Sequence, residues 1–259
     1  MNRILTIIDK EWAEVFKNRL VIFSIVFPPL IFTILPLVIL SEFGRTAGRG
    51  SNLPPNFMAT CGSLPMQVCI QLFTVNEFLL FYMLLPVIIP NIIAAYSIIG
   101  EKTTHSLEPL LATPISTSEL LMGKSLAAAI PAILVTWVSF LIFVLLLPVG
   151  GVSPVVVEHV TSATWLLAIF LAGPFMAVLS VNFALLISSR VNDPRAAQQI
   201  SVVLILPILL VLFGQIAGFI VLNPTTMLLF ILALGIIDIG VIYAGARLFQ
   251  RETILTRWK

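Results

Sequence analysis

Six stretches of about 20 apolar residues constrain the fold of this chain more than any other feature. A helix that rises 1.5 Å per residue crosses the hydrocarbon core of a bilayer in roughly 20 residues. The stretches are continuous rather than ten-residue alternations, which indicates helices and not barrel strands. They predict an all-α polytopic membrane protein with six transmembrane helices, at about 21–40, 78–99, 125–147, 163–187, 200–222 and 226–246.

Composition excludes the soluble and disordered classes. Hydrophobic residues make up 59% of the 259 residues and charged residues only 10%, whereas soluble domains carry roughly 25% charged residues. Disorder requires low hydrophobicity, and the mean hydropathy is +1.10. The formal net charge of +2 is too small to indicate a nucleic acid partner. The expected surroundings are a lipid bilayer.

Basic residues in the loops predict the orientation, because cytoplasmic loops carry the excess of Lys and Arg. One side has only Arg45 and Arg49. The other side has the remaining 12 of the 14: Arg3, Lys10, Lys17, Arg19, Lys102, Lys124, Arg190, Arg195, Arg247, Arg251, Arg257 and Lys259. Both termini are therefore expected in the cytoplasm.

The N-terminal segment 1–19 has the pattern of an amphipathic helix. On a helical wheel its apolar residues form one arc with Ile7 as the misfit: Ile4, Leu5, Ile8, Trp12, Val15 and Phe16. Charged residues, Glu11 among them, occupy the rest of the wheel. This pattern predicts a helix that lies in the cytoplasmic interface before the first span. The alternative is a helix that packs on a soluble partner.

The outer loop 41–77 contains both cysteines of the chain, Cys61 and Cys69. In an oxidising compartment they could form a disulfide. The alternative is a pair of free thiols, because the spacing does not show that the Cα atoms come within bridging distance. Two thiols without further ligands do not predict a metal site.

Asp238 is the only one of the 26 charged residues deep in a predicted span. A carboxylate at that depth indicates a functional site by default. The alternative is a structural aspartate, protonated or hydrogen-bonded at a helix contact that Gly235 and Gly240 permit. Its candidate polar partners in other spans are Asn91, Asn182 and Gln215.

The chain lacks the residues that membrane-embedded catalysis or nucleotide binding would require. Its two histidines lie outside the predicted spans, which disfavours a membrane-embedded metalloprotease or a serine–histidine dyad. Gly123-Lys124-Ser125 is not a phosphate-binding loop, because Ser118 replaces the first glycine of that motif and no strand precedes it. We expect a non-enzymatic protein without a metal or cofactor site.

The cytoplasmic loop 100–124 is the most informative segment. Leu107, Leu110 and Leu111 lie on one face of a short helix that Pro114 ends. Ser116 and Glu119 have the spacing of a capping box that starts the next helix and leads into the third span. The loop therefore predicts a short amphipathic helix on the cytoplasmic face, suited to fit the groove of a partner.

This loop resembles the signature of the permease subunits of type-2 ABC transporters. His105-Ser106 replaces the usual Gly-Thr, which is a mild departure. The matching positions are Glu101, Lys102, Leu107, Glu108, Leu110, Leu111, Thr113, Pro114, Ile115, Ser116, Glu119, Leu120, Gly123 and Lys124. The six spans and the N-terminal helix also fit, so the resemblance covers 1–259 as a single transmembrane domain.

The resemblance implies a transport subunit of an ATP-driven exporter. Such a permease forms the pathway as a dimer, with a second copy or a homologous permease, and two ATPase subunits bind beneath. ATP and Mg²⁺ belong to those partner chains. The loop helix couples ATPase closure to the spans, and Glu101, Glu108 and Lys124 make or position polar contacts there. The expected location is the plasma or inner membrane of a prokaryote.

The main alternative is an ion-coupled secondary transporter or channel, which would use Asp238 for coupling. Neither the substrate nor the choice between homodimer and heterodimer follows from the residues.

Overall fold

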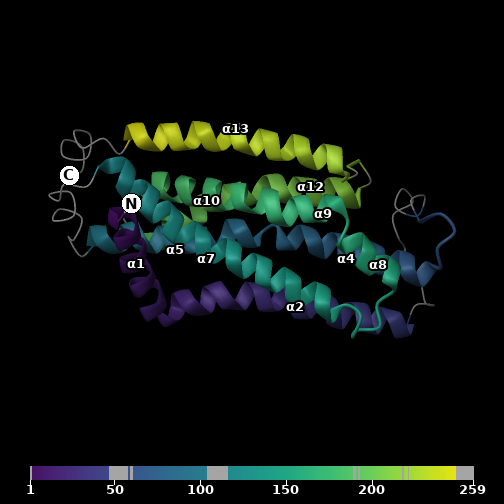
Figure 1. Cartoon of the computed structure of the whole chain (residues 1–259). Coiled ribbons are helices and arrows are strands. Elements are labelled where there is room, and N and C mark those ends of the chain that lie inside the picture. Colours follow the sequence, from purple (N-terminus) through teal and green to yellow (C-terminus); the bar gives the residue numbers. More distant parts are fainter. Residues whose placement is uncertain are drawn as a thin grey trace.

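The computed structural model describes residues 2–46, 58, 61–103, 116–188, 191, 193–217, 219–220 and 222–248. This part of the chain contains helices and no strand. The long helices run roughly along one common direction and form an elongated bundle (Figure 1). The helix α1 (Asn2–Lys17) lies at one end and the short helix α8 (Pro154–Val160) at the other. We call these the α1 end and the α8 end.

The remaining helices follow in chain order. The first half of the chain contributes α2 (Arg19–Thr46), α4 (Met66–Tyr82), α5 (Leu85–Thr103) and α7 (Thr117–Leu146). After α8 come α9 (Ala163–Leu167), the π-helix η1 (Ala168–Ala172) and α10 (Gly173–Ser188). The last group is α11 (Pro194–Ser201), the 3-10 helix η2 (Val202–Ile205), α12 (Leu206–Ile216) and α13 (Pro224–Leu248).

Six helical segments are long and apolar enough to cross a membrane, which confirms the predicted all-α polytopic fold. They are Val21–Ser41, Met66–Ser97, Ser118–Leu146, Pro154–Ser188, Arg195–Ile216 and Pro224–Gly245. The second segment begins well before the predicted start at residue 78, because the helix continues into the less apolar residues of α4. The fourth also begins early, since it includes α8.

The second segment forms the centre of the bundle. In its most apolar window 78% of the residues are buried, against 22% for the first and sixth segments. Leu79, Leu85 and Ile89 are completely buried there. The outer segments expose large apolar side chains such as Phe23 (60%) and Ile236 (73%). A lipid environment accommodates that surface, whereas water would penalise it by about 25 cal/mol per Å².

A short break divides the second segment. Met83 and Leu84 form a turn between α4 and α5. At this break the Tyr82 hydroxyl lies 2.8 Å from Thr33 Oγ1 on α2, with both groups buried. Buried hydroxyls need such partners. This contact ties the first segment to the central one.

The structure joins Cys61 and Cys69 in a disulfide at the start of α4, with the Cα atoms 5.8 Å apart. This separation lies inside the range that a disulfide requires. Both cysteines are buried, and Cys69 is 1% exposed. The bridge fixes the segment that precedes α4 against the helix.

Candidate functional site

The N-terminal helix α1 packs on the bundle by a face that is rotated from the predicted apolar arc, since Ile8 and Val15 of that arc are buried at 6% and 8% exposure. Ile7 and Glu11 are buried, at 6% and 2% exposure. Leu5 and Phe16 are exposed at 53% and 60%. The expected misfit Ile7 is therefore a packing residue, and the expected polar residue Glu11 faces the protein. Leu5 and Phe16 remain available to lipid, as an interfacial helix requires.

A buried ion pair joins α1 to α7. Lys124 Nζ lies 2.5 Å from Glu11 Oε1, and each side chain is 3% exposed. The same ammonium donates a hydrogen bond to Ser97 Oγ on α5, at 2.8 Å. Three helices thus meet at one cation at the α1 end. Because Lys124 is buried among these helices, the structure favours the positioning part of its predicted role, and the predicted coupling to an ATPase stays a prediction.

Close packing surrounds this ion pair. A Cβ atom added to Gly123 would lie 2.8 Å from Ile7 Cγ2, so only glycine lets α1 approach α7 this closely. On the next turns, the Trp12 indole donates a hydrogen bond to the Ala127 carbonyl oxygen at 2.9 Å. Gly123, Lys124 and Ala127 hold α1 against the first few turns of α7.

The predicted capping box at the start of α7 is confirmed. Ser116 Oγ accepts a hydrogen bond from the Glu119 backbone N–H at 3.2 Å, and the Ser116 N–H donates to Glu119 Oε2 at 2.8 Å. Arg3 on α1 lies 4.0 Å from the same carboxylate. From this cap α7 continues to Leu146 as one helix, through the third span.

Removal of the cap should loosen the start of α7. We expect Ser116→Ala to lower the free energy of unfolding by about 1 kcal/mol, because it leaves the Glu119 N–H without its acceptor. The measurement is unfolding in mixed detergent micelles, with hydrogen exchange at residues 117–120. The comparison variant Ser118→Ala removes the hydroxyl that lies 3.1 Å from Ser116 Oγ, and leaves the acceptor of the Glu119 N–H in place. Equal protection in wild type and Ser116→Ala would contradict the role of the cap.

Part of the predicted coupling loop lies outside the described residues: Leu107, Glu108, Leu110, Leu111 and Pro114. The backbone of Glu101 and Lys102 belongs to the last turn of α5, and their side chains are likewise outside the described part. Of the loop residues predicted from the sequence, the structure places Ser116, Glu119, Gly123 and Lys124 together at the α1 end.

The described residues do not pair Asp238 with any of its candidate polar partners. Within the described residues, neither carboxylate oxygen of Asp238 has a hydrogen-bond partner. Asn182 accepts from Ser125 Oγ at 3.2 Å and donates to the Val178 carbonyl oxygen at 2.8 Å. The side-chain carbonyl oxygens of Asn91 and Gln215 are buried without a partner in the same part of the chain. None of the three amides pairs with Asp238.

Glu77 is an intramembrane carboxylate that the sequence reasoning assigned to the outer loop. It lies within α4, and among the described residues both its buried oxygens lack a partner. The apolar residues that alternate with polar ones before Glu77, such as Ile70, Leu72 and Val75, are the available signal that the helix begins earlier. Asp238 is therefore not the only acidic residue within the spans.

These features define a multi-pass membrane protein whose N-terminal helix is fastened to the first turns of a long spanning helix. The model of the ABC-2 family transporter protein matches residues 5–248, and the chain belongs to this family. It is thus the permease, the membrane component, of an ABC transporter and a transport subunit rather than an enzyme. ABC-2 permeases in general work with an ABC ATPase. Comparison with curated proteins gives no match.

Proposed function

We propose that the chain forms half of the translocation pathway of an ATP-driven exporter in a cell membrane. It pairs with a second copy or a homologous permease, and two separate ATPase subunits bind at the α1 end. This chain binds no cofactor, and ATP and Mg²⁺ are held by the ATPase chains. The positive-inside pattern of Lys and Arg supports a cytoplasmic α1 end, where an ATPase is available.

The buried contact of Lys124 with Glu11 and Ser97 is the observation that carries this proposal. A rigid link between α1, α5 and α7 would transmit movement to the spans when an ATPase pushes on the loop 104–115, which connects α5 to α7. The loop and α1 then move as one unit when nucleotide closes the ATPase dimer. Because α7 is continuous, the same movement tilts the third span.

The residues of the loop divide into two roles. Glu101, Lys102 and Glu108 make polar contacts with the ATPase, while Leu107, Leu110, Leu111 and Pro114 form the helix that fits its groove. Ser116, Glu119, Gly123 and Lys124 act within this chain, where they position α7. In this division Glu108 determines ATPase binding and Lys124 determines the transmission of movement.

Charge reversal at Glu108 tests the contact with the ATPase. We expect Glu108→Arg to reduce the amount of ATPase that co-purifies with the tagged full chain in mild detergent by at least about fivefold, since charge reversal replaces the proposed attraction by a repulsion. The matched control is Glu158→Arg, because Glu158 is exposed at the α8 end. Equal recovery with both variants would contradict the proposed contact.

An ion-coupled transporter or channel that uses Asp238 is the second candidate. The unpaired carboxylate favours it, whereas membership of the ABC-2 family favours ATP coupling. The energy source separates the two in proteoliposomes. Ion-gradient-driven flux by the purified chain alone would support the second candidate, and flux that requires the ATPase and ATP would support the first.

A further inference from the structure

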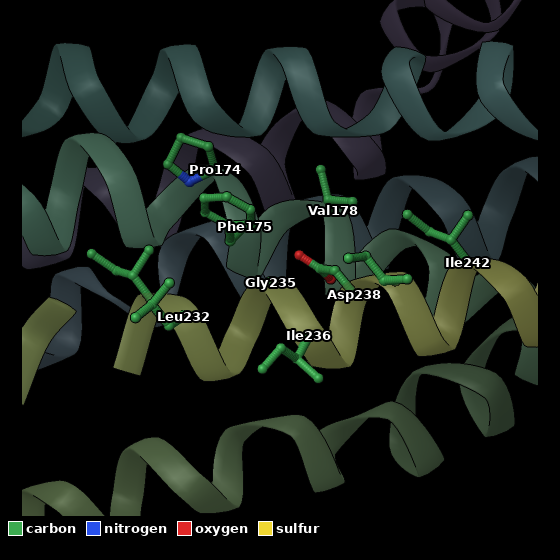
Figure 2. Close-up of a pocket in the computed structure, with 10 residues that line it drawn as sticks. Pro174, Phe175, Val178, Leu232, Gly235, Ile236, Asp238 and Ile242 are labelled. Carbon is green, nitrogen blue, oxygen red and sulfur yellow. The ribbon is translucent and has the colours of Figure 1, made fainter. Parts of the chain in front are cut away.

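A groove of about 540 Å³ lies between α10 and α13, within two membrane-spanning segments (Figure 2). This volume is in the range of sites for small organic molecules, about 300–1,000 Å³. Phe175 and Val178 form one wall, and Gly235 and Ile239 lie on the other. Every lining residue is apolar except one, Asp238.

The carboxylate of Asp238 is buried in this groove. The residue is 4% exposed, and its side chain points from α13 toward Phe175 and Val178 on α10 (Figure 2). Among the described residues neither oxygen has a hydrogen-bond partner, and none of the lining residues is basic. A carboxyl group in apolar surroundings is either protonated or stabilised as a carboxylate by a cation or hydrogen-bond donor. The groove therefore has the size of a ligand site and contains one acidic group, Asp238, that has no polar partner among the described residues.

We propose that the groove binds an apolar molecule that carries a protonated amine. The amine donates its N–H groups to the Asp238 oxygens, and the apolar body packs against Ile239 and the ring of Phe175. An aromatic ring face also attracts a cation. The acyl chain of a lipid fills such a groove but leaves the carboxylate unpaired. The inference rests on the proposed function, for which it supplies the chemical class of the transported substrate.

Gly235 contributes the space in the groove. A Cβ atom added there would lie 3.7 Å from Phe175 Cε1, in ordinary contact. The larger side chain of Gly235→Leu projects beyond that contact and narrows the groove without changing its charge. Asp238→Asn changes the charge at nearly constant volume. The two variants thus separate the two requirements for binding.

Binding of radiolabelled dodecylamine to the full chain in lipid nanodiscs tests the proposal. We expect saturable binding that the neutral alcohol dodecanol does not displace. Asp238→Asn should weaken it at least about tenfold, because the amide carries no charge to pair with the amine, and Gly235→Leu should also weaken it. The matched control Ile237→Asn adds the same amide one residue away, at a half-exposed side chain that does not line the groove, and should bind as wild type.

Three results would overturn the proposal. The first is that wild type shows no saturable binding of dodecylamine. The second is that dodecanol displaces the bound dodecylamine as efficiently as unlabelled dodecylamine does. The third is that the variant Ile236→Cys cross-links to a second copy of the chain across the groove. If Asp238→Asn does not fold, wild-type affinity in Gly235→Leu overturns it. The assay requires no ATPase, so its failure leaves the proposed coupling intact. Loss of ATPase co-purification with intact amine binding would count against the coupling alone.

Discussion

Lys124→Ala should lower the free energy of unfolding by about 3–5 kcal/mol, because it leaves the Glu11 carboxylate buried without its counter-charge. The Lys124 and Glu11 side chains are each 3% exposed, so water does not replace the lost contact. Unfolding of the full chain in mixed detergent micelles measures the change. In the complex with its ATPase, the same variant should lose substrate-coupled ATP hydrolysis while ATPase co-purification persists.

Lys10→Ala is the matched control for this prediction. Lys10 lies 3.7 Å from Glu14 on the same helix, with side chains 40% and 54% exposed. Exposed pairs contribute about 0–1 kcal/mol, so the change should be small. The double variant Glu11→Leu with Lys124→Met should recover most of the stability, since apolar replacement of a buried ion pair is often neutral. Equal losses for Lys124→Ala and Lys10→Ala would contradict a buried structural pair.

Gly123→Ala should lower the free energy of unfolding by roughly 1–3 kcal/mol, the usual cost of overpacking. Helix propensity alone predicts the opposite sign, since alanine is better than glycine in a helix by about 1 kcal/mol. The steric term wins because the added Cβ would lie 2.8 Å from Ile7 Cγ2 and 3.0 Å from Ile7 Cβ, atoms close to the α1 backbone. The same unfolding assay in mixed detergent micelles applies.

Gly240→Ala on α13 is the control for the glycine prediction. A Cβ atom added there meets no described atom within 4 Å, so propensity should dominate and stability should stay constant or rise. Ile7→Ala combined with Gly123→Ala should cost less than the sum of the single changes, because residues in contact are not independent. Strict additivity would show that Ile7 and Gly123 do not meet.

The spans could be predicted because bilayer thickness imposes a length that apolar runs reveal directly. Their ends could not, as Glu77 illustrates. Hydropathy treats this glutamate as the end of a loop, whereas the helix continues through it from Met66 to Tyr82. Backbone hydrogen bonds sustain a helix through a single charged residue when the neighbouring turns are apolar.

At the start of α7, the capping box could be predicted from the sequence, but the contacts with α1 could not. The capping box of Ser116 and Glu119 follows from a local spacing, so the sequence contains it. The burial of Glu11 does not, because a helical wheel assigns every charge to the solvent side. Its partner Lys124 is 113 residues away. A pairing between distant segments requires the tertiary packing that the sequence pattern does not specify.

For Asp238 too, the sequence predicts the position along the helix but not the neighbouring side chains. Its depth in the sixth span follows from position alone, and the structure buries it as expected. The predicted pairing with Asn91, Asn182 or Gln215 does not occur in the described residues. Which side chains meet depends on the rotation of each helix about its axis, and spans of nearly uniform hydrophobicity carry little information on that rotation.

The central claim is that α1 and α7 move as one unit when nucleotide binds to the partner ATPase. Electron spin resonance distances test it most directly. Spin labels replace the exposed residues Leu5 on α1, Met122 on α7 and Leu229 on α13 of the full chain in complex with its ATPase. We predict that ATP leaves the Leu5–Met122 distance unchanged and shifts the Met122–Leu229 distance. A shift between Leu5 and Met122 with a constant Met122–Leu229 distance would contradict the account.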